Sequence, residues 1–214
     1  MVESSRTYLP AAGHHWLLPL YDPVAKLLGG DRARKALIDQ ADLRPGDRIL
    51  EIGCGTGTLL MQIKRLHPDV DVVGLDPDSK ALDRARRKAA RAKVSMKLDQ
   101  GFADELPYPK ASFDRVLSSF MFHHLPMEAK GKTLQAARRV LRPGGEFHMV
   151  DFEGPQDAKR RWLTCLFHSD DQLKDNSEAR VLSLMRQAGF ADPKKIGRRA
   201  MLAGHVAFYR TSAP

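Results

Sequence analysis

Three glycines at alternate positions, Gly53, Gly55 and Gly57, separate an apolar run from a helix-compatible run. The apolar run is Ile49–Ile52, and the helix-compatible run is Leu59–Leu66. A strand that turns into a helix through glycines brings bare backbone close to a ligand, because no Cβ stands in the way. The spacing therefore predicts a loop whose main chain contacts a bound small molecule.

An acidic side chain is expected next to this loop. Asp76 ends a second apolar run, Val70–Leu75, and a carboxylate at such a strand end can accept hydrogen bonds from ribose hydroxyls. The loop and the carboxylate together predict a nucleoside-containing cofactor.

Two cofactor classes compete at this point. The dinucleotide fingerprint needs Gly or Ala at position 58, where this chain has Thr58, so an NAD(P)-dependent oxidoreductase is the disfavoured alternative.

Two histidines and two serines accompany the end of a further expected strand, Phe113–Phe120. The ordinary pKa of histidine, about 6.5, suits proton transfer, so His123 or His124 is a candidate catalytic base lining the substrate pocket. The alternative is that one histidine packs into the core and the other caps a turn, because adjacent residues face different ways. Of Ser118 and Ser119, one is expected to contact the cofactor.

The elements that must position these residues alternate along the chain. Strands are expected at Ile49–Ile52, Val70–Leu75, Val94–Leu98, Phe113–Phe120 and Glu146–Phe152, and helices at about 31–41, 59–66, 79–92, 127–141 and 176–188. Alternation of this kind predicts a parallel sheet with right-handed crossovers. Two final extended runs, Lys194–Gly197 and Gly204–Tyr209, have no helix between them and must therefore pair antiparallel.

The predicted fold is accordingly α/β and Rossmann-like, with seven mostly parallel strands and a C-terminal antiparallel hairpin. Asp31 is the expected N-cap of the first long helix. Asp78 or Ser79 is expected to cap the helix over 79–92, whose apolar side should be Leu82, Ala85, Ala89 and Ala92. Residues 1–42, with a short helix near Pro23–Leu28, are expected to form a helical cap, and residues 43–214 the main domain of one globular unit.

Composition narrows the class of protein. The 214 residues contain two cysteines and carry a net charge of +9. Neither cysteine belongs to a CxxC pair, so no metal site is expected. No run of about 18 apolar residues and no signal-peptide pattern occurs, so we expect a cytoplasmic protein without stable membrane insertion. Much of the basic charge fits the wet face of one helix and lacks interleaved aromatic residues, which argues against a nucleic-acid partner.

Five motifs, in order, resemble those of class I S-adenosylmethionine-dependent methyltransferases, close to the type 11 group that includes the quinone-biosynthesis C-methyltransferases. The resemblance covers about residues 20 to 210. The motifs are Ile49-Leu-Glu-Ile-Gly-Cys-Gly-Thr-Gly57, Gly74-Leu-Asp-Pro77, Ala103-Asp-Glu-Leu-Pro-Tyr108 with Ser112-Phe-Asp114, Ser118-Ser-Phe-Met-Phe-His-His-Leu125, and Leu141-Arg-Pro-Gly-Gly145.

The resemblance implies S-adenosylmethionine as cofactor and roles for individual residues. Glu51 would support the glycine loop or contact the cofactor's ammonium, Asp76 would accept both ribose hydroxyls, and the backbone N–H of Ala103 would contact adenine. Cys54 and Pro77 would line the same site. The family often has Asp before that alanine, where this chain has Phe102. Either Asp104 replaces the lost contact or the Phe102 ring packs on the base.

The same resemblance extends to the cap and to a late insertion. Tyr21 would lie over the cofactor, and His14, Trp16 and His168 are candidates for the acceptor pocket, with packing of the N-terminus or of a satellite core as the alternative. The predicted reaction is in-line methyl transfer to a small-molecule or lipid-like acceptor, in a monomer or homodimer. A nucleic-acid methyltransferase or binding protein stays open on charge alone.

Overall fold

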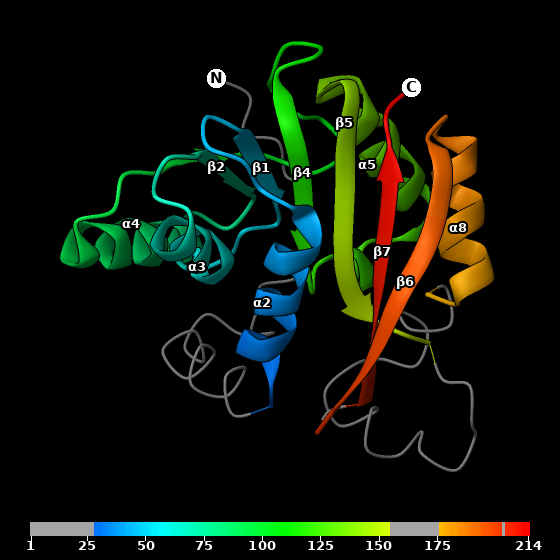
Figure 1. Cartoon of the computed structure of the whole chain (residues 1–214), viewed down its shortest axis with the longest axis horizontal. Coiled ribbons are helices and arrows are strands. Elements are labelled where there is room, and N and C mark those ends of the chain that lie inside the picture. Colours follow the sequence, from blue (N-terminus) through cyan, green and yellow to red (C-terminus); the bar gives the residue numbers. More distant parts are fainter. Residues whose placement is uncertain (1–27, 155–175, 203) are drawn as a thin grey trace.

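The computed structural model describes residues 28–154, 176–202 and 204–214. Its centre is one seven-stranded sheet in the order β3-β2-β1-β4-β5-β7-β6 (Figure 1). The strands are β1 Arg48–Ile52, β2 Asp71–Asp76, β3 Lys97–Gln100, β4 Phe113–Ser119, β5 Leu141–Phe152, β6 Ala191–Met201 and β7 Gly204–Ser212. The strand order reverses between β1 and β4, which is where ligands bind in open α/β sheets.

The pairing confirms the predicted mixture of parallel and antiparallel strands. β1 pairs in parallel with β2 and with β4, and β4 pairs in parallel with β5. β7 lies between β5 and β6 and runs antiparallel to both. The chain can make this last reversal with a tight connection because antiparallel neighbours need no crossover helix.

Helices cover both faces of the sheet and divide its core into two parts. The helices are α2 Gly30–Ala41, α3 Thr58–Leu66, α4 Ser79–Ala92, α5 Met127–Val140 and α8 Glu178–Gln187, with the short 3₁₀ helix η2 Phe122–His124. α2, α3 and α4 contribute Leu37, Leu59 and Leu82 to one apolar cluster. α5 and α8 contribute Leu134 and Met185 to the other. α2 thus packs on the sheet itself.

Two predictions about helix ends and faces were wrong. The N-cap of α2 is Gly29, at φ 96°, and Asp31 lies in the first turn instead. Its negative charge interacts favourably there with the positive end of the helix dipole. Ala92 is exposed at the end of α4, whereas Leu82, Ala85 and Ala89 are buried as expected. The prediction of Asp78 as N-cap of α4 is confirmed, because its carboxylate accepts hydrogen bonds from the N–H groups of Lys80 and Ala81.

The observed boundaries of β3, β5 and β6 differ from the predicted ones. β3 begins at Lys97 rather than Val94, because Lys93 adopts φ 54° and the N–H of Val94 still bonds the carbonyl of Ala89 to close α4. β5 begins at Leu141, because that residue pairs with Phe113 across an irregular stretch before the regular ladder resumes at Glu146. β6 is longer than predicted, since its mostly exposed residues pair with β7.

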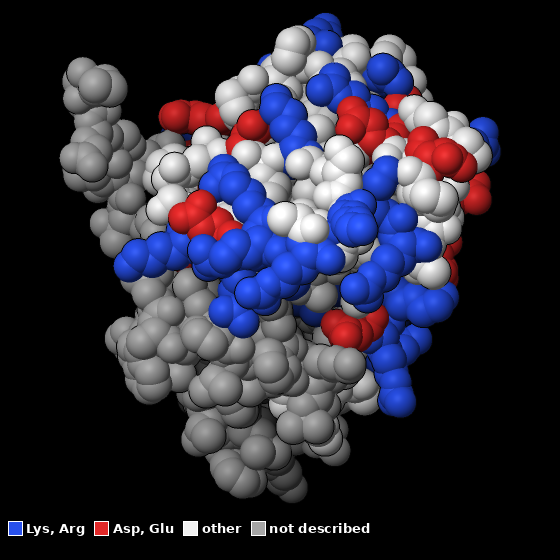
Figure 2. All heavy atoms as spheres, turned by 90° about the vertical axis from the view of Figure 1, so that its left-hand side faces the viewer, with Lys and Arg blue, Asp and Glu red and all other residues white. Residues whose placement is uncertain are grey.

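Basic side chains gather on one outer face of the molecule. α4 carries six basic residues, Lys80, Arg84, Arg86, Arg87, Lys88 and Arg91, and one acidic residue, Asp83. Figure 2 shows this face as a dense group of Lys and Arg over the side where α3 and α4 lie. The buried side of α4 is made of alanines and one leucine, so the charge occupies the wet face of the helix.

Candidate cofactor and acceptor site

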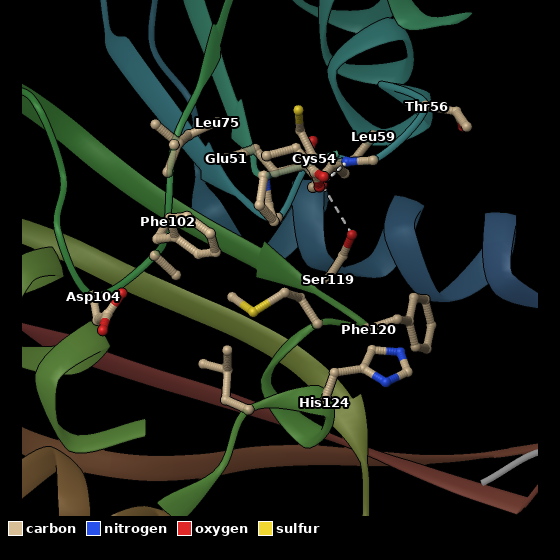
Figure 3. Close-up of a pocket in the computed structure, with 18 of the residues that line it drawn as sticks. Glu51, Cys54, Thr56, Leu59, Leu75, Phe102, Asp104, Ser119, Phe120 and His124 are labelled. Atoms are coloured by element: carbon tan, nitrogen blue, oxygen red, sulfur yellow. Dashed lines mark hydrogen bonds between the residues drawn. The ribbon is translucent and has the colours of Figure 1, made fainter. Parts of the chain in front are cut away.

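A cavity of about 390 Å³ opens at the carboxyl ends of β1, β2 and β4. Its walls come from the glycine loop after β1, the end of β2, the segment after β3 and the turn after β4 (Figure 3). The lining includes Arg34, Glu51, Gly53, Cys54, Gly55, Thr56, Asp76, Pro77, Phe102, Ala103, Asp104, Ser119, Phe120, Met121, His124, Leu125, Pro126 and Ala129. Most of the predicted cofactor residues therefore share one cavity.

The glycine loop is held to β2 by backbone hydrogen bonds. The N–H groups of Gly53 and Cys54 both donate to the carbonyl of Leu75, at 2.8 and 3.1 Å. Gly53 and Gly55 have φ of 71° and 51°, which favours glycine. A Cβ on Gly55 would meet no atom within 4 Å, so this backbone faces open space in the cavity. The main chain at Gly55 is therefore open to a ligand, whereas a Cβ on Gly53 would lie 2.2 Å from Met121 Cγ.

Gly57 differs from the other two loop glycines. It is the N-cap residue of α3 and is absent from the cavity wall. A Cβ at this position would lie 3.0 Å from the Cβ of Ala85 on α4. The structure therefore places Gly57 at the contact between two helices, where a small residue is required, and does not place it beside the predicted cofactor.

Asp76 closes the loop from the end of β2. Its Oδ2 accepts a hydrogen bond from the N–H of Gly55 at 2.7 Å, and its Oδ1 accepts one from the N–H of Asp78 at 2.9 Å. Burial raises the pKa of this carboxyl to about 6, against the opposing effect of these two hydrogen bonds. Each carboxylate oxygen has two lone pairs, so each retains capacity for a hydroxyl donor such as a ribose provides.

Glu51 is a buried acid at the back of the same cavity. Its Oε1 accepts a hydrogen bond from the hydroxyl of Ser119 at 3.0 Å (Figure 3). Its Oε2 is buried and has no hydrogen-bond partner in the described part of the chain. Burial raises the pKa of Glu51 to about 8. A cation bound beside this carboxyl would favour its ionised form and lower its pKa again.

The segment after β3 forms the opposite wall. Phe102, Ala103 and Asp104 all line the cavity, and Figure 3 shows Phe102 and Asp104 on the side away from Phe120 and His124. The segment is anchored just beyond these residues, because the Arg139 guanidinium donates to the carbonyls of Leu106 and Tyr108, both at 2.7 Å. The Ala-x-x-Leu-Pro-Tyr motif therefore serves to fix this wall.

The structure separates each pair of neighbouring polar residues at the end of β4. Ser119 lines the cavity, whereas Ser118 is buried away from it, with no hydrogen-bond partner for its Oγ among residues 28–154, 176–202 and 204–214. His124 lines the cavity, whereas His123 does not. Successive side chains of a strand point to opposite faces, which explains why Ser119 lines the cavity and Ser118 does not.

His123 belongs to a buried pair with Asp151 of β5. Its Nδ1 lies 2.5 Å from Asp151 Oδ1, and both side chains are 1% exposed. Asp151 also accepts hydrogen bonds from the backbone N–H groups of His123 and Phe152. Burial opposes ionisation of Asp151, but His123, the N–H of Phe152 and His124 together lower the pKa of the carboxyl. The rings of His123 and His124 are 3.9 Å apart, so this pair fixes the turn that carries His124.

Sequence reasoning missed Arg34 and Met121, which both line the cavity. Arg34 is three and four residues from Leu37 and Ile38, which are buried on the inner side of α2. That spacing was a signal that Arg34 shares the buried face of the helix. Four other predicted site residues, His14, Trp16, Tyr21 and His168, lie outside the described residues.

Other site classes receive no support in the described part of the chain. No helix there is long and apolar enough to cross a membrane. No group of three or more His, Cys, Asp or Glu there could hold a metal ion. Cys54 is a free, buried thiol whose pKa is raised by burial, and it therefore belongs to the wall of the cavity as a small apolar group.

Comparison with known proteins agrees with the resemblance. Residues 49–145 match the family model of a methyltransferase domain. The chain is 36% identical over 142 residues to a demethylmenaquinone methyltransferase of Deinococcus radiodurans, covering 65% of this chain and 58% of that protein. It is 32% identical over 162 residues to a ubiquinone/menaquinone biosynthesis C-methyltransferase of Vibrio cholerae, covering 72% and 62%. The chain thus spans about three fifths of these relatives.

A solved structure extends the likeness of the fold. Phosphoethanolamine N-methyltransferase 2 of Haemonchus contortus, in complex with S-adenosylmethionine, superposes with a TM-score of 0.77 at 17% identity, over 94% of this chain and 58% of that one. An identity this low shows the fold alone. Together with the family match and the geometry of the cavity, these similarities show that the chain contains a class I S-adenosylmethionine-dependent methyltransferase domain, matched over residues 49–145.

Proposed function

We propose that this protein transfers the methyl group of S-adenosylmethionine to a small-molecule acceptor with a quinol-type ring. The observation that carries the proposal is the convergence of Glu51, Gly55 and Asp76 on one wall of a single cavity. A buried acid, open backbone and a strand-end carboxylate match the ammonium, the linker and the ribose diol of this cofactor. When bound, the cofactor supplies a methyl group already activated by its sulfonium charge.

The acceptor class is inferred from the far side of the cavity and from the relatives. Met121, Leu125, Pro126 and Ala129 give that side an apolar lining, which suits a ring or an isoprenoid-like group. The Deinococcus and Vibrio relatives are named for quinone biosynthesis. A small, largely apolar acceptor is therefore the proposal.

His124 is the proposed proton acceptor. It projects from η2 onto the cavity wall, next to Phe120 in Figure 3. In the proposed step a bond forms between the acceptor atom and the methyl carbon, and the carbon–sulfur pair leaves with sulfur as a neutral thioether. The acceptor's proton passes to a ring nitrogen of His124. Positioning of the acceptor supplies most of the rate enhancement in such a displacement, and the base a smaller share.

Calorimetric titration with S-adenosylmethionine tests the cofactor half of this proposal. We expect the Asp76→Asn protein to bind at least about tenfold more weakly, because charge-assisted hydrogen bonds contribute about 1.5–3 kcal/mol each. Asp71→Asn is the matched control, since Asp71 is exposed at the other end of the same strand. Undiminished binding by Asp76→Asn, or preferential binding of NADH by the unaltered protein, would contradict the assignment.

An acceptor screen tests the other half. Purified protein is incubated with S-adenosylmethionine and a panel of quinols, phenols and amines, and formation of S-adenosylhomocysteine is followed. We expect turnover with quinol-type rings. For the best acceptor, His124→Gln should lower kcat about 10²-fold or more and leave cofactor affinity unchanged. Turnover confined to amines, or full activity of His124→Gln, would contradict the acceptor class or the role of the histidine, respectively.

A further inference from the structure

Another hollow lies between α3 and α4, on the basic face of the molecule (Figure 2). Its volume is about 360 Å³, and its wall includes three basic side chains, Arg65 of α3 and Lys88 and Arg91 of α4. The one acidic residue in the described wall is Asp31 of α2, whose carboxylate lies 3.5 Å from the guanidinium of Arg34. This α3–α4 hollow therefore carries an excess of positive charge.

The two arginines of the hollow have no acidic partner. Arg86, on another side of α4, lies 2.8 Å from the carboxylate of Asp83. Arg65 and Arg91, by contrast, form no side-chain hydrogen bond or ion pair with any residue that the structure describes. A planar guanidinium donates paired hydrogen bonds to phosphate oxygens. Two such groups, carried by the two helices that wall one hollow, suit a phosphate group between them.

Gln62 of α3 adds a second unmet polar group to the same wall. Its Oε1 is buried and has no hydrogen-bond partner among the described residues. An acceptor in this state needs a donor. A phosphate or diphosphate near neutral pH carries a hydroxyl as well as unprotonated oxygens, so a ligand of this class can donate to Gln62 and accept from the arginines.

Lys88 connects the hollow to the cofactor cavity. Its Nζ donates to Thr58 Oγ1 at 2.9 Å and to Thr56 Oγ1 at 3.4 Å. Thr56 is 2% exposed and lines the cofactor cavity, whereas Thr58 lines both the cavity and the hollow. An ammonium group on α4 therefore helps to hold the end of the glycine loop in place.

We propose that the α3–α4 hollow binds a phosphate-type anion, and that the bound anion weakens cofactor binding by drawing Lys88 away from the glycine loop. An ammonium is held more strongly by an anion than by neutral hydroxyls, so the anion competes with Thr56 and Thr58 for Lys88 Nζ. The released loop contains Gly55 and Gly57, both at positive φ, and a ligand that must order a mobile loop binds less tightly.

The anion site stands independently of the proposed function, and its effect on the cofactor rests on that function. Linkage requires the effect to be reciprocal, so the cofactor weakens the anion by the same factor. The site is therefore tested first without cofactor, and the link is tested second.

Calorimetry with inorganic diphosphate in a low-salt buffer tests the site. We expect saturable binding of one equivalent. Arg65→Gln and Arg91→Gln should each weaken it about tenfold or more, because each removes a charge-assisted hydrogen bond. Arg87→Gln is the matched control, since it removes the same charge from an exposed position of α4 outside the hollow. Absence of binding, or an equal loss in Arg87→Gln, overturns the proposal.

Titration of S-adenosylmethionine at saturating diphosphate tests the link. The affinity of the unaltered protein should fall about fivefold or more. Lys88→Met should bind the cofactor weakly even without diphosphate. Arg91→Gln, which spares Lys88, should keep the full cofactor affinity and lose the effect of diphosphate. A cofactor affinity that diphosphate leaves unchanged overturns the link. A decrease that persists in Arg91→Gln places diphosphate in the cofactor cavity and also overturns it.

Vesicle sedimentation separates two sources of the anion. If the protein sediments with phosphatidylglycerol vesicles and not with phosphatidylcholine vesicles, and diphosphate releases it, the anion is a lipid head group. If diphosphate binds and neither vesicle does, the anion is a free phosphate compound. Affinity for single-stranded RNA with none for diphosphate overturns the proposal. Thermal melts establish that each variant is folded. If the protein binds diphosphate and no S-adenosylmethionine, the proposed function fails and the anion site remains.

Discussion

The carboxyl of Glu51 stands out among single residues because the fold favours its neutral form. Its pKa is about 8 in the folded protein against an ordinary value of 4.5, chiefly through burial. Between these two pH values the unfolded chain releases the proton and the folded chain keeps it. The folded protein therefore loses stability as pH rises from 4.5 to 8. A bound ammonium would stabilise the ionised form of Glu51 and so reduce this loss of stability.

Glu51→Gln should therefore be more stable than the unaltered protein at pH 8, by about 2–4 kcal/mol, because a shift of one pKa unit corresponds to about 1.4 kcal/mol. At pH 5 the two proteins should differ little. Urea denaturation at both pH values measures this difference. An equal gain at pH 5 and pH 8 would show that packing, and not ionisation of Glu51, causes the effect.

At the scale of elements, the short helix η2 depends on β5. Asp151 of β5 accepts hydrogen bonds from the ring and the backbone N–H of His123. These bonds hold in place the turn that carries His124 to the cavity wall. The pKa of Asp151 is lowered, because His123, the N–H of Phe152 and His124 together outweigh the effect of burial. The stabilisation it provides is therefore present above the ordinary pKa of about 3.8 and is lost as pH falls through the lower folded value.

Asp151→Asn should lower the free energy of unfolding at pH 7 by about 2 kcal/mol or more, because buried donors lose a charged acceptor. It should also lower kcat while the affinity for S-adenosylmethionine is kept, because the displaced turn carries His124 and not Asp76. Denaturation and calorimetry of the same sample measure both. Asp39→Asn, at an exposed site on α2, is the control. Loss of cofactor affinity equal to the loss of kcat would contradict a local role.

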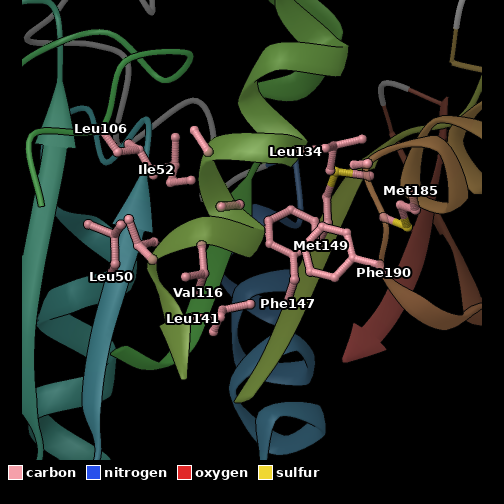
Figure 4. Packing of buried hydrophobic residues seen from close by; sticks show 14 of the residues in the cluster. Leu50, Ile52, Leu106, Val116, Leu134, Leu141, Phe147, Met149, Met185 and Phe190 are labelled. Atoms are coloured by element: carbon pink, nitrogen blue, oxygen red, sulfur yellow. The ribbon is translucent and has the colours of Figure 1, made fainter. Parts of the chain in front are cut away.

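At the scale of the whole molecule, repulsion between basic side chains destabilises the folded state, and burial of the apolar core stabilises it. The chain carries +9, and α4 places like charges four residues apart at Lys80 and Arg84, Arg84 and Lys88, and Arg87 and Arg91, an arrangement that destabilises a helix. The core beneath opposes this. Figure 4 shows Leu50, Val116 and Phe147 from three strands in contact with helical side chains on one face of the sheet.

Added salt should accordingly stabilise the protein. The Debye length falls from about 30 Å at 0.01 M to about 8 Å at 0.15 M ionic strength, so repulsion along α4 is screened. We expect the melting temperature to rise by about 2–4 °C over this range, and by less in Arg87→Gln, which removes one exposed charge. Scanning fluorimetry measures it. A melting temperature that falls with salt would indicate that ion pairs outweigh the repulsion.

The sequence by itself determined the order of the elements and predicted most of the residues that line one side of the cavity. Strand-like and helix-like apolar patterns and the glycine loop are local features of the sequence. They could therefore be recognised without knowledge of the three-dimensional structure. The boundaries that moved, at Lys97 and at Leu141, are those where a helix cap or an irregular strand pairing competed with the apolar pattern. Whether residues 1–42 act as a cap stays a prediction.

Only the tertiary structure decided which of two neighbouring residues lines the cavity. Ser119 rather than Ser118, and His124 rather than His123, line the cavity, because side-chain direction depends on how the strand and turn are paired with β1 and β5. The same holds for Arg34, which lines the same cavity as Glu51 only when α2 packs on the sheet. Direction and long-range proximity arise from packing between elements distant in the chain, and a local pattern carries no information about either.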